Sequence, residues 1–276
     1  MSSLFGIQRP LIAMLHVAPC PGVEGFPGMM AAAELLRRDL VAYLSAGVDG
    51  LLLENMHDFP CIPEEQMGPE VAAYLTHLAV VARTFCDEFR GGAARPLPIG
   101  VQVLFAANRT ALAIAQAAGL QFIRAEGWTY SHVSDKGFLD AQGGRVKRYQ
   151  HHIGADDILV FTDIKKKHAS HALTADVGIG EMAGLMELHR SDGIIITGRV
   201  TGDPPALEDI AAARNATRLP LLIGSGLDAR NLADHFPVAD AFIVGSAFKR
   251  DGKWQEAVDI DRVRAFMDEL RRLRSR

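Results

Sequence analysis

The feature that most constrains the fold is a series of eight short, almost continuously apolar segments spread along the chain. Each is rich in Val, Ile and Leu. Apolarity without alternation over so few residues is typical of strands buried on both faces of a parallel sheet. The segments are LIAMLH (11–16), VDGLLLEN (48–55), LPIGVQVLF (97–105), LQFIRAE (120–126), DILVFTDI (157–164), SDGIIITG (191–198), LPLLIGSG (219–226) and ADAFIVGS (239–246).

Amphipathic helices are expected between these strands and after the last one. Apolar residues at helical spacing predict them over 29–46, 69–89, 109–118, 174–190, 207–216, 229–236 and 259–274. Eight strands, each followed by a helix or a long loop, predict an α/β fold, a (β/α)8 TIM barrel that forms a single domain over 1–276. A doubly wound parallel sheet is the alternative, because alternation of strands and helices does not by itself close a barrel.

Composition argues against a protein that binds nucleic acid or inserts into membranes. The chain carries 29 Lys and Arg against 33 Asp and Glu, a net charge of −4, so it has no general attraction for polyanions. The three consecutive lysines at 165–167 lack the interleaved aromatic residues of a nucleic-acid site. Three cysteines without metal spacing, and an N-terminus unlike a signal peptide, predict free thiols and a cytoplasmic location.

Polar residues gather at the carboxyl ends of the predicted strands, where TIM-barrel enzymes hold their active sites. One such residue alone is often a satisfied rim residue, but this many are hard to explain by folding. The predicted catalytic residues are Asp163, Lys167, His168, Glu54 and Glu126. The predicted substrate-binding residues are His16, Asn55, Asp58, Gln102, Asn108, Arg124, Lys165, Thr197 and Thr201.

Glu54 and Asp163 are the leading candidates for acid and base. An apolar environment raises a carboxyl pKa, whereas nearby lysines lower it. If the strand stays extended past residue 164, Asp163 and Lys165 both face the barrel mouth. A lysine there can stabilise a developing oxyanion or form a Schiff base. Lys166 is interpreted as a solvated loop charge.

The last two strands carry a phosphate-binding signal. Small residues let backbone N–H groups approach a phosphate, and phosphate-binding barrels place this cradle in the loops after strands seven and eight. A pair of ordinary glycine turns is the alternative reading. The predicted phosphate-binding residues are Gly224, Ser225, Gly226, Gly245 and Ser246, and a small phosphorylated ligand is the expected partner.

A metal site is a further hypothesis. His16, Glu54, Asp163 and His168 have the donor types of a divalent-metal site, but they come from separate strands, so no local spacing tests the idea. No ligand set is therefore assigned to a metal, and no organic cofactor is implied. A homo-oligomer also stays open.

Eight stretches, in this order, resemble the BtpA/SgcQ family over about residues 10–267. The resemblance implies a TIM barrel of the ribulose-phosphate-binding type, and it retains a D-x-x-x-K-H pattern at Asp163, Lys167 and His168. The stretches are MLHVAPCPG (14–22), GVDGLLLENMHDFP (47–60), GVQVLFAAN (100–108), FIRAEGW (122–128), FTDIKKKHAS (161–170), IITGRVTGDP (195–204), LIGSGLDARN (222–231) and IVGSAFKRDG (243–252).

The resemblance implies two different functions. A cyanobacterial branch is linked to photosystem I biogenesis, and a bacterial branch beside sugar-phosphotransferase genes carries a provisional nucleosidase label. Many bacterial members have Asn where this chain has Gln102 or Glu126, so substrate details do not transfer. The first hypothesis is an enzyme that uses acid/base chemistry on a small phosphorylated sugar- or nucleoside-like substrate, as a nucleosidase, lyase or isomerase. The alternative is a non-catalytic assembly or stability factor.

Overall fold

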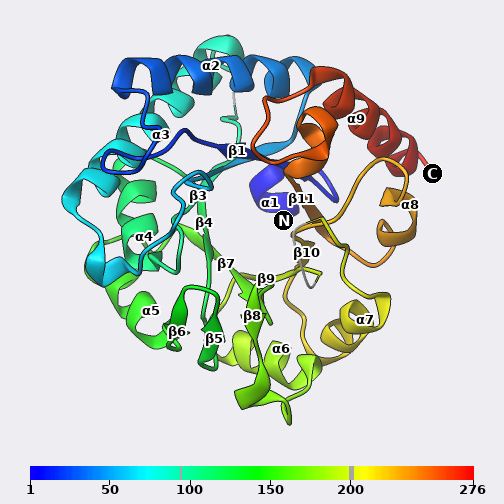
Figure 1. The fold of residues 1–276 in the computed structure, drawn as a ribbon. Coiled ribbons are helices and arrows are strands. Elements are labelled where there is room, and N and C mark those ends of the chain that lie inside the picture. The colour runs from blue at the N-terminus through cyan, green and yellow to red at the C-terminus, as the bar shows by residue number, and fades with distance from the viewer. Residues whose placement is uncertain (94, 199–201) are drawn as a thin grey trace.

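Eight parallel strands close into a barrel, which confirms the predicted (β/α)8 fold and excludes the doubly wound sheet. The computed structural model describes residues 1–93, 95–198 and 202–276. The strands follow one another round the ring in chain order, and the last pairs with the first (Figure 1). They are β1 (Leu11–His16), β2 (Gly50–Glu54), β3 (Ile99–Gln102), β4 (Phe122–Ala125), β7 (Leu159–Ile164), β9 (Gly193–Ile196), β10 (Leu221–Ile223) and β11 (Ala241–Val244).

A helix follows each barrel strand and lies on the outside of the ring, as Figure 1 shows. Gly47 ends the first of these helices in the left-handed conformation, with φ of 79°, which suits a residue without a Cβ atom. The helices are α2 (Met29–Ala46), α3 (Pro69–Phe89), α4 (Asn108–Ala117), α5 (Gly143–His152), α6 (Ile179–Leu188), α7 (Leu207–Ala216), α8 (Leu232–His235) and α9 (Ile260–Arg274). Short 3-10 turns are η1 (Glu64–Gln66), η2 (Ala172–Thr174), η3 (Ser246–Phe248) and η4 (Arg250–Gly252).

Two of the predicted helices are shorter in the structure. The helix expected over 174–190 begins only at Ile179, because Gly178 is in an extended conformation with ψ of 155°. The helix expected over 229–236 is reduced to the four residues of α8. The helices expected over 29–46, 69–89 and 207–216 have the predicted bounds.

Apolar side chains fill the barrel interior towards the amino ends of its strands. Successive residues of a strand point to opposite faces, so every second residue points inward. The inward set forms a cluster separate from the one between strands and helices. The short helix α1 (Ser2–Phe5) adds Phe5 to this cluster, where its ring centroid lies 6.1 Å from that of Phe122. The amino end of the barrel is therefore closed by apolar packing.

A small antiparallel sheet on the barrel loops, and the helix α5, were not predicted. The sheet has the order β6-β5-β8, with β5 (His132–Ser134), β6 (Gly137–Leu139) and β8 (Ala169–Ser170). Strands of two or three residues are too short for a periodic pattern, and α5 buries few apolar side chains. The sheet ties the loop after β4 to the loop after β7, between α5 and α6 in Figure 1.

Replacing Gly100 by Ala tests the packing of the barrel interior. Gly100 pairs with Phe122 on the next strand, and a Cβ atom on Gly100 would lie 2.2 Å from the Phe122 ring. We expect Gly100→Ala to lower the free energy of unfolding by about 1–3 kcal/mol, because an overpacked core must shift its side chains. Urea unfolding followed by circular dichroism measures the change.

Gly184→Ala provides the matched control. Gly184 lies inside α6, and a Cβ atom there would meet its nearest neighbour, the Ala216 carbonyl oxygen, at an ordinary 3.6 Å. This change should stabilise the protein by about 0.5–1 kcal/mol, because Ala favours the helix over Gly. Equal stability of the two variants would contradict the packing argument.

Candidate functional site

A layer of polar side chains closes the carboxyl end of the barrel interior. The alternation that points Ile12 and Met14 inward also points His16 inward, and the same parity holds on the neighbouring strands. The layer's two carboxylates, Glu54 and Asp163, and its guanidinium, Arg124, are each at most 7% exposed. The layer consists of His16, Glu54, Gln102, Arg124, Asp163 and Thr197.

Arg124 and Asp163 form a two-pronged ion pair inside this layer. Arg124 Nε and Nη2 each donate to one carboxylate oxygen of Asp163, both at 2.8 Å. Burial by itself would lower the pKa of the guanidinium, but the charges of Asp163 and Glu54 outweigh it and raise that pKa. Both Asp163 oxygens are engaged, so this carboxylate holds Arg124 in place, and its predicted catalytic role stays a prediction.

Glu54 is held as an anion by its positive neighbours. Its Oε2 lies 3.3 Å from His16 Nε2. Burial alone would raise the pKa of Glu54, but the hydrogen bond from His16 and the charges of Arg124 and Lys167 lower it to about 2. At neutral pH this residue is therefore a carboxylate that can balance positive charge, and it has no proton to give.

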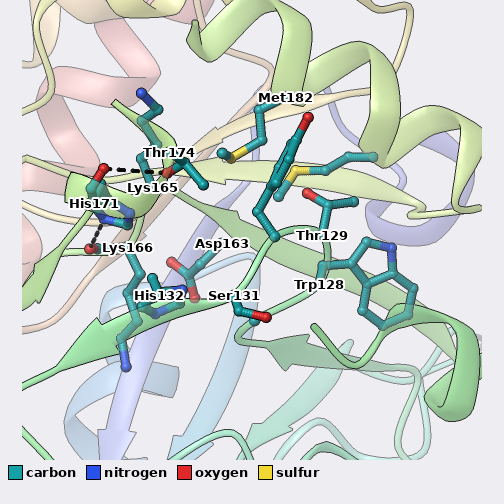
Figure 2. Close-up of a pocket in the computed structure, with 13 residues that line it drawn as sticks. Trp128, Thr129, Ser131, His132, Asp163, Lys165, Lys166, His171, Thr174 and Met182 are labelled. Carbon is teal, nitrogen blue, oxygen red and sulfur yellow. Dashed lines mark hydrogen bonds between the residues drawn. The ribbon is translucent and has the colours of Figure 1, made fainter. Parts of the chain in front are cut away.

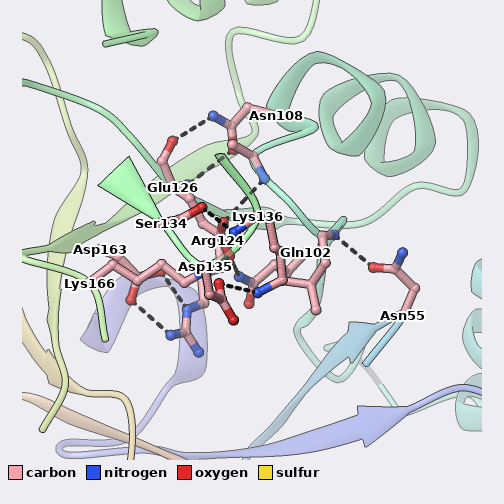
Figure 3. A network of polar contacts seen from close by, with 12 residues as sticks. Asn55, Gln102, Asn108, Arg124, Glu126, Ser134, Asp135, Lys136, Asp163 and Lys166 are labelled. Atoms are coloured by element: carbon pink, nitrogen blue, oxygen red, sulfur yellow. Dashed lines mark hydrogen bonds and ion pairs between the residues drawn. The ribbon is translucent and has the colours of Figure 1, made fainter. Parts of the chain in front are cut away.

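The Glu126 carboxylate contacts three residues at once (Figure 3). Gln102 Nε2 donates to Oε1 at 2.6 Å, and the Ala106 backbone N–H donates to Oε2 at 3.2 Å. The Lys166 ammonium also pairs with Oε1. The expectation that Lys166 is a solvated charge is wrong, because β7 ends at Ile164 and the following loop brings the ammonium to the buried Glu126.

Lys167 differs from Lys166 and from the buried Lys249, which pairs with Asp39 at 3.1 Å. Within the described residues, the half-buried Lys167 ammonium has no hydrogen bond or ion pair. Burial and the positive charge of Arg124 lower the pKa of Lys167 to about 8, against the pull of Glu54 and Asp163. A lysine in this state can hold or release a proton near neutral pH.

Three buried polar atoms of the layer have no partner among the described residues. They are His16 Nδ1, Gln102 Oε1 and Thr197 Oγ1, and they come from three different parts of the ring. A buried polar atom without a partner costs about 1–3 kcal/mol, so such atoms are rare unless water or a ligand meets them. All three belong to the inward layer at the barrel mouth, so this layer is the candidate place for a polar ligand.

Three of the predicted substrate-binding residues act as loop ties. Asn55 accepts from the Leu104 N–H at 2.7 Å and donates to Asp58, which accepts from the Cys20 N–H at 2.7 Å. Asn108 Nδ2 donates to the Glu126 carbonyl at 2.8 Å. These side chains form hydrogen bonds that hold the loops at the barrel mouth in place. Their contact with a substrate stays a prediction.

The glycines predicted to bind phosphate are each tightly packed. A Cβ atom on Gly224 would meet Ile195 at 2.4 Å, and one on Gly245 would meet Met14 at 3.1 Å. Gly226 has φ of 76° and packs against the backbone of Asp203. Ser225 Oγ donates to the Asp203 carbonyl at 3.1 Å, and Ser246 begins η3. Close packing is thus enough to explain why glycine stands at these positions, and phosphate binding stays a proposal.

The metal hypothesis has no support in the described residues, which hold no cluster of three or more potential metal ligands. The Asp163 carboxylate bonds Arg124 and His16 Nε2 faces Glu54. His168 is exposed, and its backbone carbonyl accepts from the Asp135 N–H at 3.2 Å. Lys165 is half-buried at a left-handed turn with φ of 41°, so the strand does not continue past Ile164 as assumed. Thr201 lies outside the described residues.

Sequence reasoning missed two side chains next to this layer. Thr129 and His132 lie on the loop after β4, and each has a buried polar atom without a partner in the described chain. The available signal was the Ser-Asp-Lys-Gly turn at 134–137 between Val133 and Phe138, which is typical of a short hairpin. That signal could have located the loop but not its hydrogen bonds.

The sequence model of the BtpA family matches residues 7–272. A Caenorhabditis elegans protein named as mitochondrial is 39% identical, over 99% of this chain and 98% of its own length. The Synechocystis protein named photosystem I biogenesis protein BtpA is 31% identical, over 96% of this chain and 89% of its own length. Because one relative is named mitochondrial, the cytoplasmic location stays a prediction. No helix in the described ranges is long and apolar enough to cross a membrane.

Solved structures of low sequence identity share the barrel. Thiamine phosphate pyrophosphorylase from Pyrococcus furiosus aligns over 96% of both chains at 10% identity and a TM-score of 0.55. Phosphoribosyl anthranilate isomerase from Thermus thermophilus aligns over 96% of this chain and 99% of its own, at 12% identity and a TM-score of 0.55. At these identities the likeness supports the TIM-barrel fold alone.

The lowered pKa of Glu54 predicts a loss of stability in acid. The folded pKa of about 2 lies below the ordinary value of 4.5, so the stabilisation is complete above pH 4.5 and is lost as pH falls towards 2. From pH 6 to 3.5, wild type should lose about 1 kcal/mol more than Glu54→Gln in urea unfolding. Parallel losses in the two proteins would contradict the buried anion.

Proposed function

This chain belongs to the BtpA family, and we propose that it is an enzyme that transfers protons on a small phosphorylated, sugar- or nucleoside-like substrate. The observation that carries the proposal is the buried layer of paired charges at the carboxyl ends of the barrel strands, beside a half-buried lysine that no described residue pairs with. Buried ion pairs contribute little to stability, or even reduce it, compared with apolar packing. A role in binding and chemistry explains why the layer is polar.

Lys167 is the proposed proton-transfer group. Its pKa of about 8 gives a usable fraction of neutral amine at physiological pH. The neutral Nζ takes a proton from a substrate carbon next to a carbonyl group, and the resulting ammonium returns it to the substrate. Arg124, fixed by Asp163, lies within electrostatic reach of Lys167 and stabilises the negative charge that develops on the substrate oxygen.

The unpartnered polar atoms supply the substrate contacts in this proposal. His16 Nδ1, Gln102 Oε1 and Thr197 Oγ1 come from separate strands and surround one mouth. The Glu54 carboxylate balances the local positive charge of Arg124 and Lys167. An uncharged part of the substrate can therefore bind near charged groups that are already paired.

Two observations favour a phosphorylated substrate. Gly224, Gly226 and Gly245 follow the last two barrel strands, where phosphate-binding barrels hold their ligand. Solved barrels of the same fold carry names that contain thiamine phosphate and phosphoribosyl groups. Because a shared fold does not fix function, phosphate binding by this chain is a matter for experiment.

The test is the exchange of substrate protons with solvent. Ribose 5-phosphate and ribulose 5-phosphate are incubated with the protein in D2O, and deuterium incorporation and product formation are followed by 1H and 31P NMR. We expect the rate to rise with pH through an ionisation near 8, because the base is the neutral amine. Lys167→Met should reduce the rate by about 10²–10⁴-fold.

Lys253→Met is the control, since Lys253 is an exposed surface lysine, and it should exchange protons at the wild-type rate. Circular dichroism confirms that both variants fold. Undiminished exchange in Lys167→Met would remove Lys167 from the mechanism. Absence of exchange or product with both compounds would contradict the proposed substrate class.

A non-catalytic assembly factor is the second candidate. One observation favours it, besides the name of the Synechocystis relative. Phe59, on the loop after β2, is 59% exposed, and Phe138, on β6, is 62% exposed. Exposed aromatic rings on loops are typical of protein contact sites.

Pull-down from native extract separates the two functions. A factor should retain its partner in a Glu54→Gln/Asp163→Asn double variant and lose it in a Phe59→Ser/Phe138→Ser double variant. The enzyme proposal expects no stable partner in either case, together with loss of proton exchange in the first variant.

A further inference from the structure

A pocket beside the polar layer contains groups that the proposed proton transfer does not use. This side pocket lies between the loop after β4, the loop after β7 and the helix α6 (Figure 2). It shares Asp163 with the polar layer, so it opens from the same site. The residues that carry the argument are Thr129, His132, Asp163, His171, Met182 and Met186.

Two side chains of the side pocket are buried without a partner. Thr129 is 7% exposed and His132 is 6% exposed, and neither Thr129 Oγ1 nor His132 Nε2 has a hydrogen bond within the described residues. Each of these buried atoms carries an unfavourable desolvation free energy, which a bound group that hydrogen-bonds to it can remove. The two atoms therefore point to a ligand with complementary polar atoms.

The His132 ring presents a hydrogen-bond acceptor to the side pocket. Burial and the positive charges of His171 and Lys166 lower the pKa of His132 to about 4, so the ring is neutral at pH 7. The ring also hydrogen-bonds the backbone at Tyr130, and a carbonyl there can only accept, so the proton lies on that side. The nitrogen left over, Nε2, carries the lone pair.

Neighbouring groups hold this ring in place. The His171 ring lies 5.2 Å from the His132 ring, between centroids, and its Nε2 donates to the Lys166 carbonyl at 2.9 Å. Figure 2 shows the His132 and His171 rings on the same side of the pocket as Lys166. An acceptor fixed in this way can discriminate between ligands by the position of their donors.

The other walls favour an uncharged ligand group. The Asp163 carboxylate lines the side pocket, and Arg124 balances its charge. Lys165 and Lys166 also line it, and the Lys166 ammonium pairs with Glu126. Met182 and Met186, from α6, supply an apolar surface. A neutral acceptor, a hydroxyl group and an apolar wall match one hydroxyl group of a sugar, which donates to the acceptor, and the C–H bonds beside it, which pack on apolar atoms.

We propose that the side pocket binds one free hydroxyl group of the sugar part of the substrate, with His132 Nε2 and Thr129 Oγ1 as its partners. This inference rests on the proposed function and makes it more specific. The phosphate lies elsewhere in the mouth, away from the Asp163 carboxylate. The side pocket thus selects phosphorylated compounds that carry a hydroxyl group able to enter it.

The test compares the affinity for ribose 5-phosphate with that for inorganic phosphate by isothermal titration calorimetry. Wild type should bind ribose 5-phosphate more tightly. Thr129→Val and His132→Phe should each weaken ribose 5-phosphate binding about three- to tenfold, as expected for one lost hydrogen bond, and leave phosphate binding unchanged. Thermal unfolding verifies that the variants fold.

Thr174→Val is the matched control. The Thr174 hydroxyl lies in the same pocket but already donates to the His171 carbonyl at 3.4 Å, so its loss should leave the preference for ribose 5-phosphate unchanged. Equal affinities of wild type, Thr129→Val and His132→Phe for ribose 5-phosphate would overturn the side-pocket proposal and leave the proposed function standing. If wild type neither binds nor exchanges protons on any of the phosphorylated compounds, both proposals fall.

Discussion

The two-pronged ion pair between Arg124 and Asp163 is the interaction on which the arrangement of the barrel mouth depends. Closing eight strands into a ring points every second residue of each strand inward. Apolar side chains fill the amino end of the interior, but the carboxyl end holds charges, which must be paired to be tolerated there. The pair links the neighbouring strands β4 and β7, and its combined charge is close to zero.

The charge states of the neighbouring side chains depend on this ion pair. The hydrogen bond from His16 and the positive charges of Arg124 and Lys167 keep Glu54 ionised, and Arg124 in turn makes the ammonium form of Lys167 less favourable. Lys166 has a different environment, since it pairs with Glu126. Three lysines adjacent in sequence therefore differ in chemistry, because each meets a different side of the mouth.

Local pattern was enough to predict the barrel and the end of it where polar residues gather. Continuous apolar runs such as 11–16 mark strands buried on both faces, and the polar residue at the end of each run marks the rim. The β6-β5-β8 sheet escaped this reasoning because its pairing across two loops leaves no periodic trace in strands of two or three residues. For the same reason, the unpartnered Thr129 and His132 could not be recognised.

The sequence by itself determined the fold class, the family and the end of the barrel where polar residues gather, since each follows from local patterns and their order along the chain. Only the tertiary structure decided which of these residues are paired and which are left open. Asp163 is engaged by a residue 39 positions away, and Lys167, two residues after a turn in the chain, is not engaged by any described residue. Pairing and pKa depend on distances between segments, and those distances exist only once the ring has closed.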